Sequence, residues 1–76
     1  MKQAEALVRV AAGRDPQTGL AAVAALRRLI ERLEALHVRA ARSQGWSWQQ
    51  IADELGVSRQ AVHKKHAPFE NAETRK

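Results

Sequence analysis

Four polar side chains near the C-terminal end of the chain have the chemistry needed to recognise nucleic-acid bases and phosphates. Arg59, Gln60, His63 and Lys64 follow one another closely in the sequence. An arginine can donate two hydrogen bonds to the O6 and N7 atoms of guanine, and a glutamine can pair in a similar bidentate way with adenine. A histidine ring can donate to or accept from a base edge or a phosphate, and a lysine suits a phosphate.

The charge balance favours an acidic or anionic partner. The chain has 76 residues, with 13 Lys and Arg against 8 Asp and Glu, and its formal net charge is +5. Such a surplus on a small protein favours an acidic polymer or an anionic surface. The chain contains no cysteine, which excludes disulfides and thiolate metal sites. Its length suits one domain rather than two.

Helix-forming residues dominate the sequence, and we predict an all-α fold. Ala, Leu, Arg, Glu and Gln are good helix formers, and no alternating β-branched run indicates a strand. Gly13 is expected to end the first helix, Asp15 and Pro16 to begin the second, and Gly45 to end it. Pro68 predicts that the last helix stops before it. The predicted helices cover residues 3–12, 16–43, 47–55 and 58–66.

The sequence from Gly45 to His66, GWSWQQIADELGVSRQAVHKKH, has the features of two short helices joined by a tight turn. Ser47 and Gln50 have the spacing of a capping box. Gly56 supplies a residue that tolerates positive φ in the turn, and Ser58 is suited to cap the second helix. The residues expected to fill the inner corner, with a small alanine where the helices approach, are Ile51, Ala52, Leu55, Val57 and Val62.

This pattern resembles the helix-turn-helix of bacterial transcription regulators, including region 4 of sigma factors. The stretch and the long Ala/Leu/Arg-rich helix before it are also similar to small actinobacterial helix-turn-helix proteins. The resemblance implies that the second short helix enters the major groove of double-stranded DNA. Arg59, Gln60 and His63 are then the expected base-reading residues. The expected phosphate contacts are Ser47, Gln49, Gln50, Ser58, Lys64, Lys65, Arg39 and Arg42.

One position departs from this resemblance. Three residues after Val62, many such motifs have an apolar side chain that closes the core, whereas this sequence has Lys65. The aliphatic part of Lys65 can cover the core while its ammonium group reaches water or a phosphate. Phe69 is a candidate to replace the missing apolar side chain. We also expect Trp46 and Trp48 to pack at the junction with the long helix rather than to stack on bases.

The long predicted helix carries a broad apolar arc opposite an arginine-rich face. Leu26, Leu29, Leu33 and Leu36 follow alternating spacings of three and four residues, which is the pattern of a coiled-coil seam. The arc is wider than the other helices of one chain can cover. We therefore predict a homodimer held by these four leucines. Its two copies would read half-sites about 34–36 Å apart.

The sequence predicts a DNA-binding transcription regulator and not an enzyme. It contains no catalytic triad, paired-carboxylate pocket or Gly-rich phosphate loop, and we expect no cofactor. His63 and His66 have a spacing compatible with metal binding, but the two lysines between them repel a cation, so we expect no metal. The alternative is a protein-interaction adaptor, such as a sigma-factor partner or an antitoxin-like repressor, that acts through the long helix.

We expect one helical domain over residues 1–69. Within it, residues 1–44 would provide scaffold and dimerisation helices, residues 45–69 the helix-turn-helix, and residues 70–76 a loose polar tail. The first residues are too charged to be expected to act as a secretory signal, and the sequence has no apolar run of the ~20 residues that span a membrane. The expected location is therefore the cytoplasm, with association to the nucleoid when DNA is bound and no membrane partner.

Overall fold

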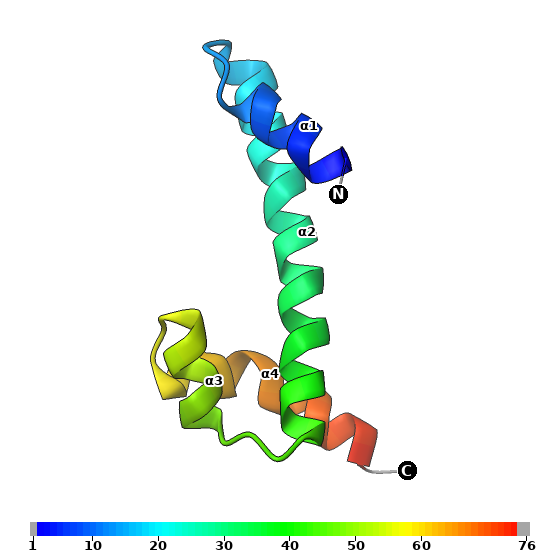
Figure 1. Cartoon of the computed structure of the whole chain (residues 1–76), viewed down its shortest axis with the longest axis vertical. Helices are drawn as coiled ribbons and strands as arrows, with labels where there is room; N and C mark the ends of the chain where they lie inside the picture. The colour runs from blue at the N-terminus through cyan, green and yellow to red at the C-terminus, as the bar shows by residue number, and fades with distance from the viewer. Residues whose placement is uncertain (1, 75–76) are drawn as a thin grey trace. The chain divides into compact units, whose positions relative to one another are not determined.

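The computed structural model describes the backbone of residues 2–74 and the side chains of residues 2–68. No strand is present among these residues, which confirms the predicted all-α fold class. The chain order of the elements is drawn in Figure 1. The helices are α1 (Lys2–Ala11), α2 (Pro16–Ser43), α3 (Trp48–Leu55) and α4 (Arg59–Thr74).

The chain divides into two compact units, Met1–Leu33 and Glu34–Lys76. Helix α2 is continuous across this boundary. The division differs from the one expected after residue 44, because the last turns of α2 belong with α3 and α4. Val38 of α2 is 5% exposed and shares a core with residues of both later helices. Whether the two units act together as a single domain stays a prediction.

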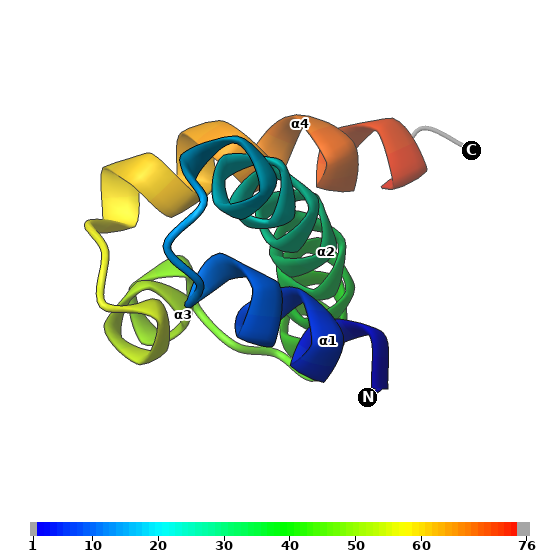
Figure 2. The ribbon, with the colours of Figure 1, turned by 90° about the horizontal axis from the view of Figure 1, so that it is seen from above.

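In the first unit, α1 returns beside the first half of α2 (Figures 1 and 2). Three small or apolar residues of α1, Ala4, Leu7 and Ala11, are half-buried at helical spacing. On α2, Ala22 is buried. No residue of α1 is fully buried, so this hairpin encloses little apolar surface by itself.

The start of α2 is fixed by Asp15, as the sequence predicts. The backbone N–H of Thr18 donates to Oδ2 of Asp15 at 3.1 Å, and the Thr18 hydroxyl donates to the same oxygen. These hydrogen bonds, that of the hydroxyl first, lower the pKa of Asp15. Pro16 occupies the first helical position, where its missing N–H has no partner to lose.

The second unit has a small three-helix core. Its buried members come from the end of α2, from α3 and from the part of α4 before Pro68, and Ala41 packs against them. Ala52 is completely buried, which agrees with its predicted place where two helices approach closely. The core residues are Val38, Trp48, Ile51, Ala52, Val62 and Ala67.

The ends of α3 and the start of α4 follow the predicted local chemistry. The Ser47 hydroxyl accepts from the Gln50 backbone at 3.1 Å, and the Gln50 side chain accepts from the Ser47 backbone at 2.8 Å. Gly56 has φ 70° and ends α3 with its N–H on the carbonyls of Ala52 and Asp53. Each bond satisfies a backbone group that a helix end leaves without a partner.

Two residues expected in the inner corner are partly open to solvent. Leu55 is 41% exposed and Val57 is 47% exposed, so their predicted burial is wrong. They flank Gly56 at the turn: Leu55 is the last residue of α3, and Val57 lies before α4 begins. Trp48 and Ala67, which the sequence analysis did not assign to this corner, complete the core.

Helix α4 passes through Pro68 and ends at Thr74, so the predicted end at residue 66 is wrong. A proline in a helix removes one hydrogen bond, here to the Lys64 carbonyl. Lys64 and Pro68 are both exposed, so water can satisfy that carbonyl and the helix can continue. The role suggested for Phe69 and the side chains of the expected tail, residues 70–76, lie outside the described residues.

Candidate DNA interface

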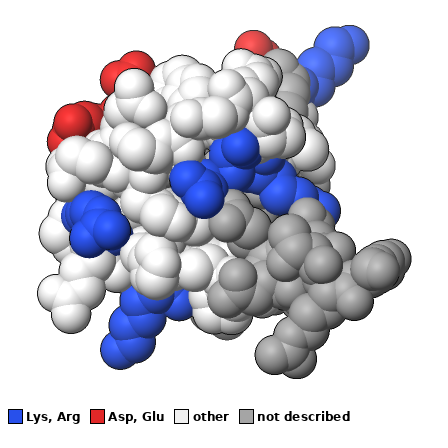
Figure 3. Space-filling view, turned by 90° about the horizontal axis from the view of Figure 1, so that it is seen from below, with Lys and Arg blue, Asp and Glu red and all other residues white. Residues whose placement is uncertain are grey.

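The first half of α4 presents an exposed polar surface. Arg59, Gln60, His63 and Lys64 are all exposed, as predicted. Val62 is buried at 3% exposure on the core side of the same helix. The sequence has no acidic residue between Leu55 and Pro68, so no carboxylate on this segment opposes an approaching phosphate. In the described part of the face in Figure 3, Lys and Arg side chains lie across the middle, and the Asp and Glu side chains lie near its margin.

The start of α3 is rigidly capped. Ser47 and Gln50 use their side chains in the capping box, while Gln49 donates through Nε2 to Oδ1 of Asp53 at 2.8 Å. The sequence analysis assigned all three as phosphate contacts. The structure shows these three side chains engaged within α3, and the first N–H groups of a helix favour an anion.

Comparison with known protein families identifies the family to which these helices belong. The family model of the homeodomain-like domain matches residues 26–65, which are 40 of the 76 residues. The chain belongs to the homeodomain-like domain family. No curated protein and no solved structure matches the chain. The match runs from α2 through α3 into α4 and supports a DNA-binding role.

Within this homeodomain-like domain, Trp48 connects α2 to the polar surface of α4. The Arg42 guanidinium lies 4.6 Å from the centre of the Trp48 ring, and Arg42 Nη1 donates to the Trp46 carbonyl at 2.7 Å. The His63 ring meets Trp48 edge-on, with centroids 5.3 Å apart and planes at 79°. The prediction that Trp48 packs at the junction is therefore confirmed. Trp46 is 37% exposed.

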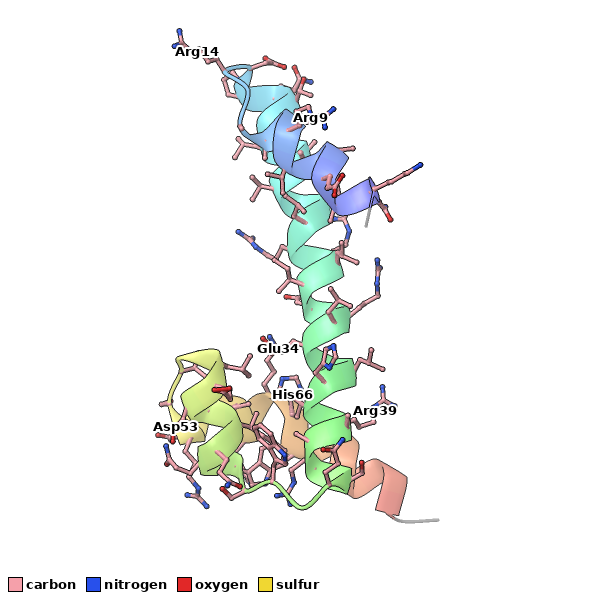
Figure 4. The ribbon with its side chains drawn as sticks, in the orientation of Figure 1. Arg9, Arg14, Glu34, Arg39, Asp53 and His66 are labelled. Atoms are coloured by element: carbon pink, nitrogen blue, oxygen red, sulfur yellow. The ribbon has the colours of Figure 1, made fainter. Side chains whose placement is uncertain are left out.

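A second polar cluster joins α2 to α4 on the domain's inner side. Oε2 of Glu34 lies 2.7 Å from His66 Nε2 and 3.0 Å from Lys65 Nζ. Figure 4 shows the Glu34 and His66 side chains directed toward one another. Burial of Glu34 opposes its ionisation, but the hydrogen bonds and charges of His66 and Lys65 outweigh it, so the pKa of Glu34 is lowered.

This cluster corrects the predicted orientation of Lys65. The Lys65 side chain is 51% exposed, whereas His66 is 7% exposed and takes the inward position. Sequence reasoning treated His66 only as a rejected metal ligand. Its position four residues after the buried Val62 is the signal that was available, because residues four apart share one helix face.

The remaining predicted contacts differ in their surroundings. Figure 4 shows Arg39 on the opposite side of α2 from α3. Ser58 Oγ accepts from the Ala61 N–H at 3.1 Å, so it caps α4 as predicted.

Among the described residues, no group of three or more His, Asp or Glu is arranged to hold a metal ion. None of the described helices is long and apolar enough to cross a membrane.

Proposed function

We propose that this homeodomain-like protein binds double-stranded DNA selectively by sequence and regulates transcription. The observation that carries the proposal is the exposed, acid-free polar surface at the start of α4, held by a capped helix-turn-helix. Such a helix fits the major groove, where each base pair has its own pattern of donors and acceptors. The role is one of binding rather than catalysis, and the place is the cytoplasm, on the nucleoid when DNA is bound.

Arg59, Gln60 and His63 are the proposed base-reading residues. Arg59 and Gln60 lie in the first turn of α4, where side chains of a recognition helix reach base edges. Arg59 suits guanine and Gln60 suits adenine. The His63 ring is held on one side by Trp48, which limits the directions in which it can meet a base.

Phosphate contacts are proposed around this reading surface. Lys64 is exposed on α4 and is the principal candidate. Ser47, Gln49 and Gln50 lie at the start of α3, where the helix dipole favours an anion. The other proposed phosphate contacts are Ser58, Lys65, Arg39 and Arg42.

A homodimer is proposed because the first unit leaves apolar surface open. Leu20, Val23 and Ile30 of α2 are 68%, 38% and 59% exposed, and among the apolar side chains of residues 2–33 only Ala22 is buried. Burying a large aliphatic side chain contributes roughly 1.5–3 kcal/mol. A second copy can cover this surface, and one short recognition helix reads few bases without a partner.

The predicted leucine contacts can be refined. Leu26, Leu29 and Leu33 are half-buried, whereas Leu36 is 55% exposed. Val23, Leu26, Ile30 and Leu33 repeat at spacings of three and four, with β-branched residues alternating with leucines. That alternation favours parallel two-stranded pairing. We propose that these four residues, the open seam, form the centre of the dimer contact, with Leu29 and Leu36 on its flank.

The alternative role is that of an adaptor for another protein. The exposed side chains of Ile30 and Leu36 could also bind the apolar face of a helix from another protein. An adaptor needs no DNA, so a single DNA-binding assay distinguishes the two functions.

Selection of bound sites from a random duplex library tests the proposed function. The purified full chain should enrich one motif, with half-sites related by two-fold symmetry if the protein is dimeric. Binding of the enriched duplex and of a scrambled duplex is then measured by fluorescence anisotropy at several salt concentrations. No enrichment together with no binding at low salt would exclude the DNA-binding role and favour the adaptor.

A further inference from the structure

Glu34 ties the recognition helix to α2 through one carboxylate oxygen. Oε2 lies within hydrogen-bond distance of two consecutive residues of α4, His66 at 2.7 Å and Lys65 at 3.0 Å. His66 is 7% exposed and the Glu34 side chain is 22% exposed. The bond to His66 is therefore largely shielded from water, where a charge-assisted hydrogen bond is stronger and more directional than at the surface.

The apolar contacts of α4 restrict the rotation of this helix about its own axis less firmly than the hydrogen bond between Glu34 and His66 can. Among the side chains of α4 that the structure describes, residues 59–68, the buried ones are Val62, His66 and Ala67, and apolar burial has no preferred direction. Side-chain tips lie about 5–6 Å from a helix axis. A rotation of about 20° would then move them by about 2 Å, far outside the ~0.5 Å window of a hydrogen bond.

We propose that Glu34 is a positioning residue that sets the sequence specificity of α4 by fixing the helix through His66. This inference rests on the proposed DNA-binding function. His66 follows His63 by three residues, which is about one helical turn, and Gln60 by six, so the clamp acts on the part of α4 next to the base-reading residues. The proposed role of Glu34 needs no contact with DNA, because Glu34 acts only through the helix that it holds.

The change in charge and the loss of positioning predict different results, which makes the inference testable. Replacing Glu34 by Gln removes a negative charge and frees the Lys65 ammonium from its carboxylate partner. Both changes favour a phosphate backbone, so binding to scrambled DNA should tighten and its salt dependence should steepen by up to about one unit. Loss of the clamp should weaken only the discrimination between the selected and scrambled duplexes.

The experiment compares Glu34→Gln with Glu54→Gln in the full-length protein. Glu54 is exposed on α3, so its substitution removes the same charge without touching the clamp. We expect Glu34→Gln to reduce the ratio of selected-site to scrambled affinity about ten-fold, as for the loss of one base contact. Glu54→Gln should leave that ratio unchanged. A folded Glu34→Gln protein that keeps the wild-type ratio would overturn the inference.

A second pair of variants keeps the test independent of the stability of Glu34→Gln. In His66→Gln, the side-chain amide can still donate to Glu34, whereas His66→Leu keeps apolar volume and has no donor. We expect the ratio to be retained in the first and reduced in the second. Equal ratios in both variants would contradict the clamp.

Amide hydrogen exchange provides a readout that needs no DNA. Residues 59–67 should exchange faster in Glu34→Gln and His66→Leu than in wild type, while residues 48–55 of α3 change less. Unchanged exchange in α4 would overturn this inference but would leave the proposed DNA-binding function standing. A wild-type protein that shows no selective DNA binding would overturn both the proposed function and this inference, whatever the exchange data show.

Discussion

At the scale of single residues, neighbouring side chains on α4 have different neighbours and therefore different roles. His63 is braced by Trp48, Lys65 is paired with Glu34, and His66 is buried against the same carboxylate. Lys64 lies between these residues and is exposed. The role of a side chain on α4 therefore depends both on its own chemistry and on the residue that it contacts on an adjacent helix.

Lys64→Ala should weaken binding to all duplexes alike. A lysine that neutralises one phosphate contributes about 0.9 to the slope of log affinity against log salt, and its removal should flatten that slope by about one. The measurement is anisotropy with selected and scrambled duplexes over a salt series. Lys2→Ala, which removes the same charge from exposed α1, is the control. A loss confined to the selected duplex would instead make Lys64 a base-reading residue.

Glu34 should make stability sensitive to acid. Its folded pKa is lowered from the ordinary value of 4.5 because the bonds and charges of His66 and Lys65 outweigh the effect of burial. The ionised carboxylate therefore stabilises the fold above about pH 4.5, and this contribution is lost as pH falls through the lowered folded value.

Thermal unfolding over a pH series checks this expectation. Glu34→Gln should be less stable than wild type by about 1–2 kcal/mol near neutral pH, and the two curves should converge as the pH falls below 4.5. Glu31→Gln, an exposed change on the same helix, should follow wild type. A constant gap between Glu34→Gln and wild type across the series would contradict the pKa direction.

At the scale of elements, the turn between α3 and α4 depends on one backbone conformation. Gly56 has φ +70°, and a Cβ built there would meet nothing within 4 Å. Substitution to alanine should therefore cost only the conformational penalty of about 1–2 kcal/mol. Gly19 has no positive φ, and its Cβ would make ordinary contact at 3.8 Å.

Urea unfolding of the two glycine variants tests this difference. Gly56→Ala should lower the midpoint, whereas Gly19→Ala, inside α2, should raise helix stability by about 0.5–1 kcal/mol. Equal effects of the same sign would show that the turn does not require positive φ.

Sequence reasoning succeeded where local chemistry decides an element and failed where tertiary packing does. The capping box at Ser47, the cap at Asp15 and the αL residue Gly56 are each set by a few adjacent residues, and all were predictable. The bond between Glu34 and His66 joins residues 32 positions apart, and no local pattern announces it. The continuation of α4 through Pro68 depends on solvent exposure, which the sequence does not display.

At the scale of the whole molecule, the proposed roles divide the chain between DNA recognition and self-association. The family match runs from within α2 to within α4. The first unit lies mostly outside that match and has the open apolar surface. Unit 1 alone buries too little to offset the entropy of ordering a two-helix hairpin. The proposed dimer gives this part of the chain a physical reason to fold.

Ile30→Lys should dissociate the dimer without unfolding the chain. Ile30 is 59% exposed in the single chain, so the substitution costs little there, but it places two charges in the proposed open seam. Sedimentation should give a monomer, with weaker binding to a two-half-site duplex. Ala21→Lys adds the same charge at an exposed position on the opposite side of α2 and should remain dimeric. A wild-type monomer at micromolar concentration, fully folded, would contradict the dimer.

The central claim is that the start of α4 reads DNA sequence, and base preference in Arg59→Ala and Gln60→Ala tests it most directly. Both residues are exposed, so circular dichroism should match wild type. Site selection with each variant should lose preference at one position per half-site, and the affinity for the wild-type site should fall by about 1–3 kcal/mol. Two folded variants that select the wild-type motif with wild-type affinity would contradict the account.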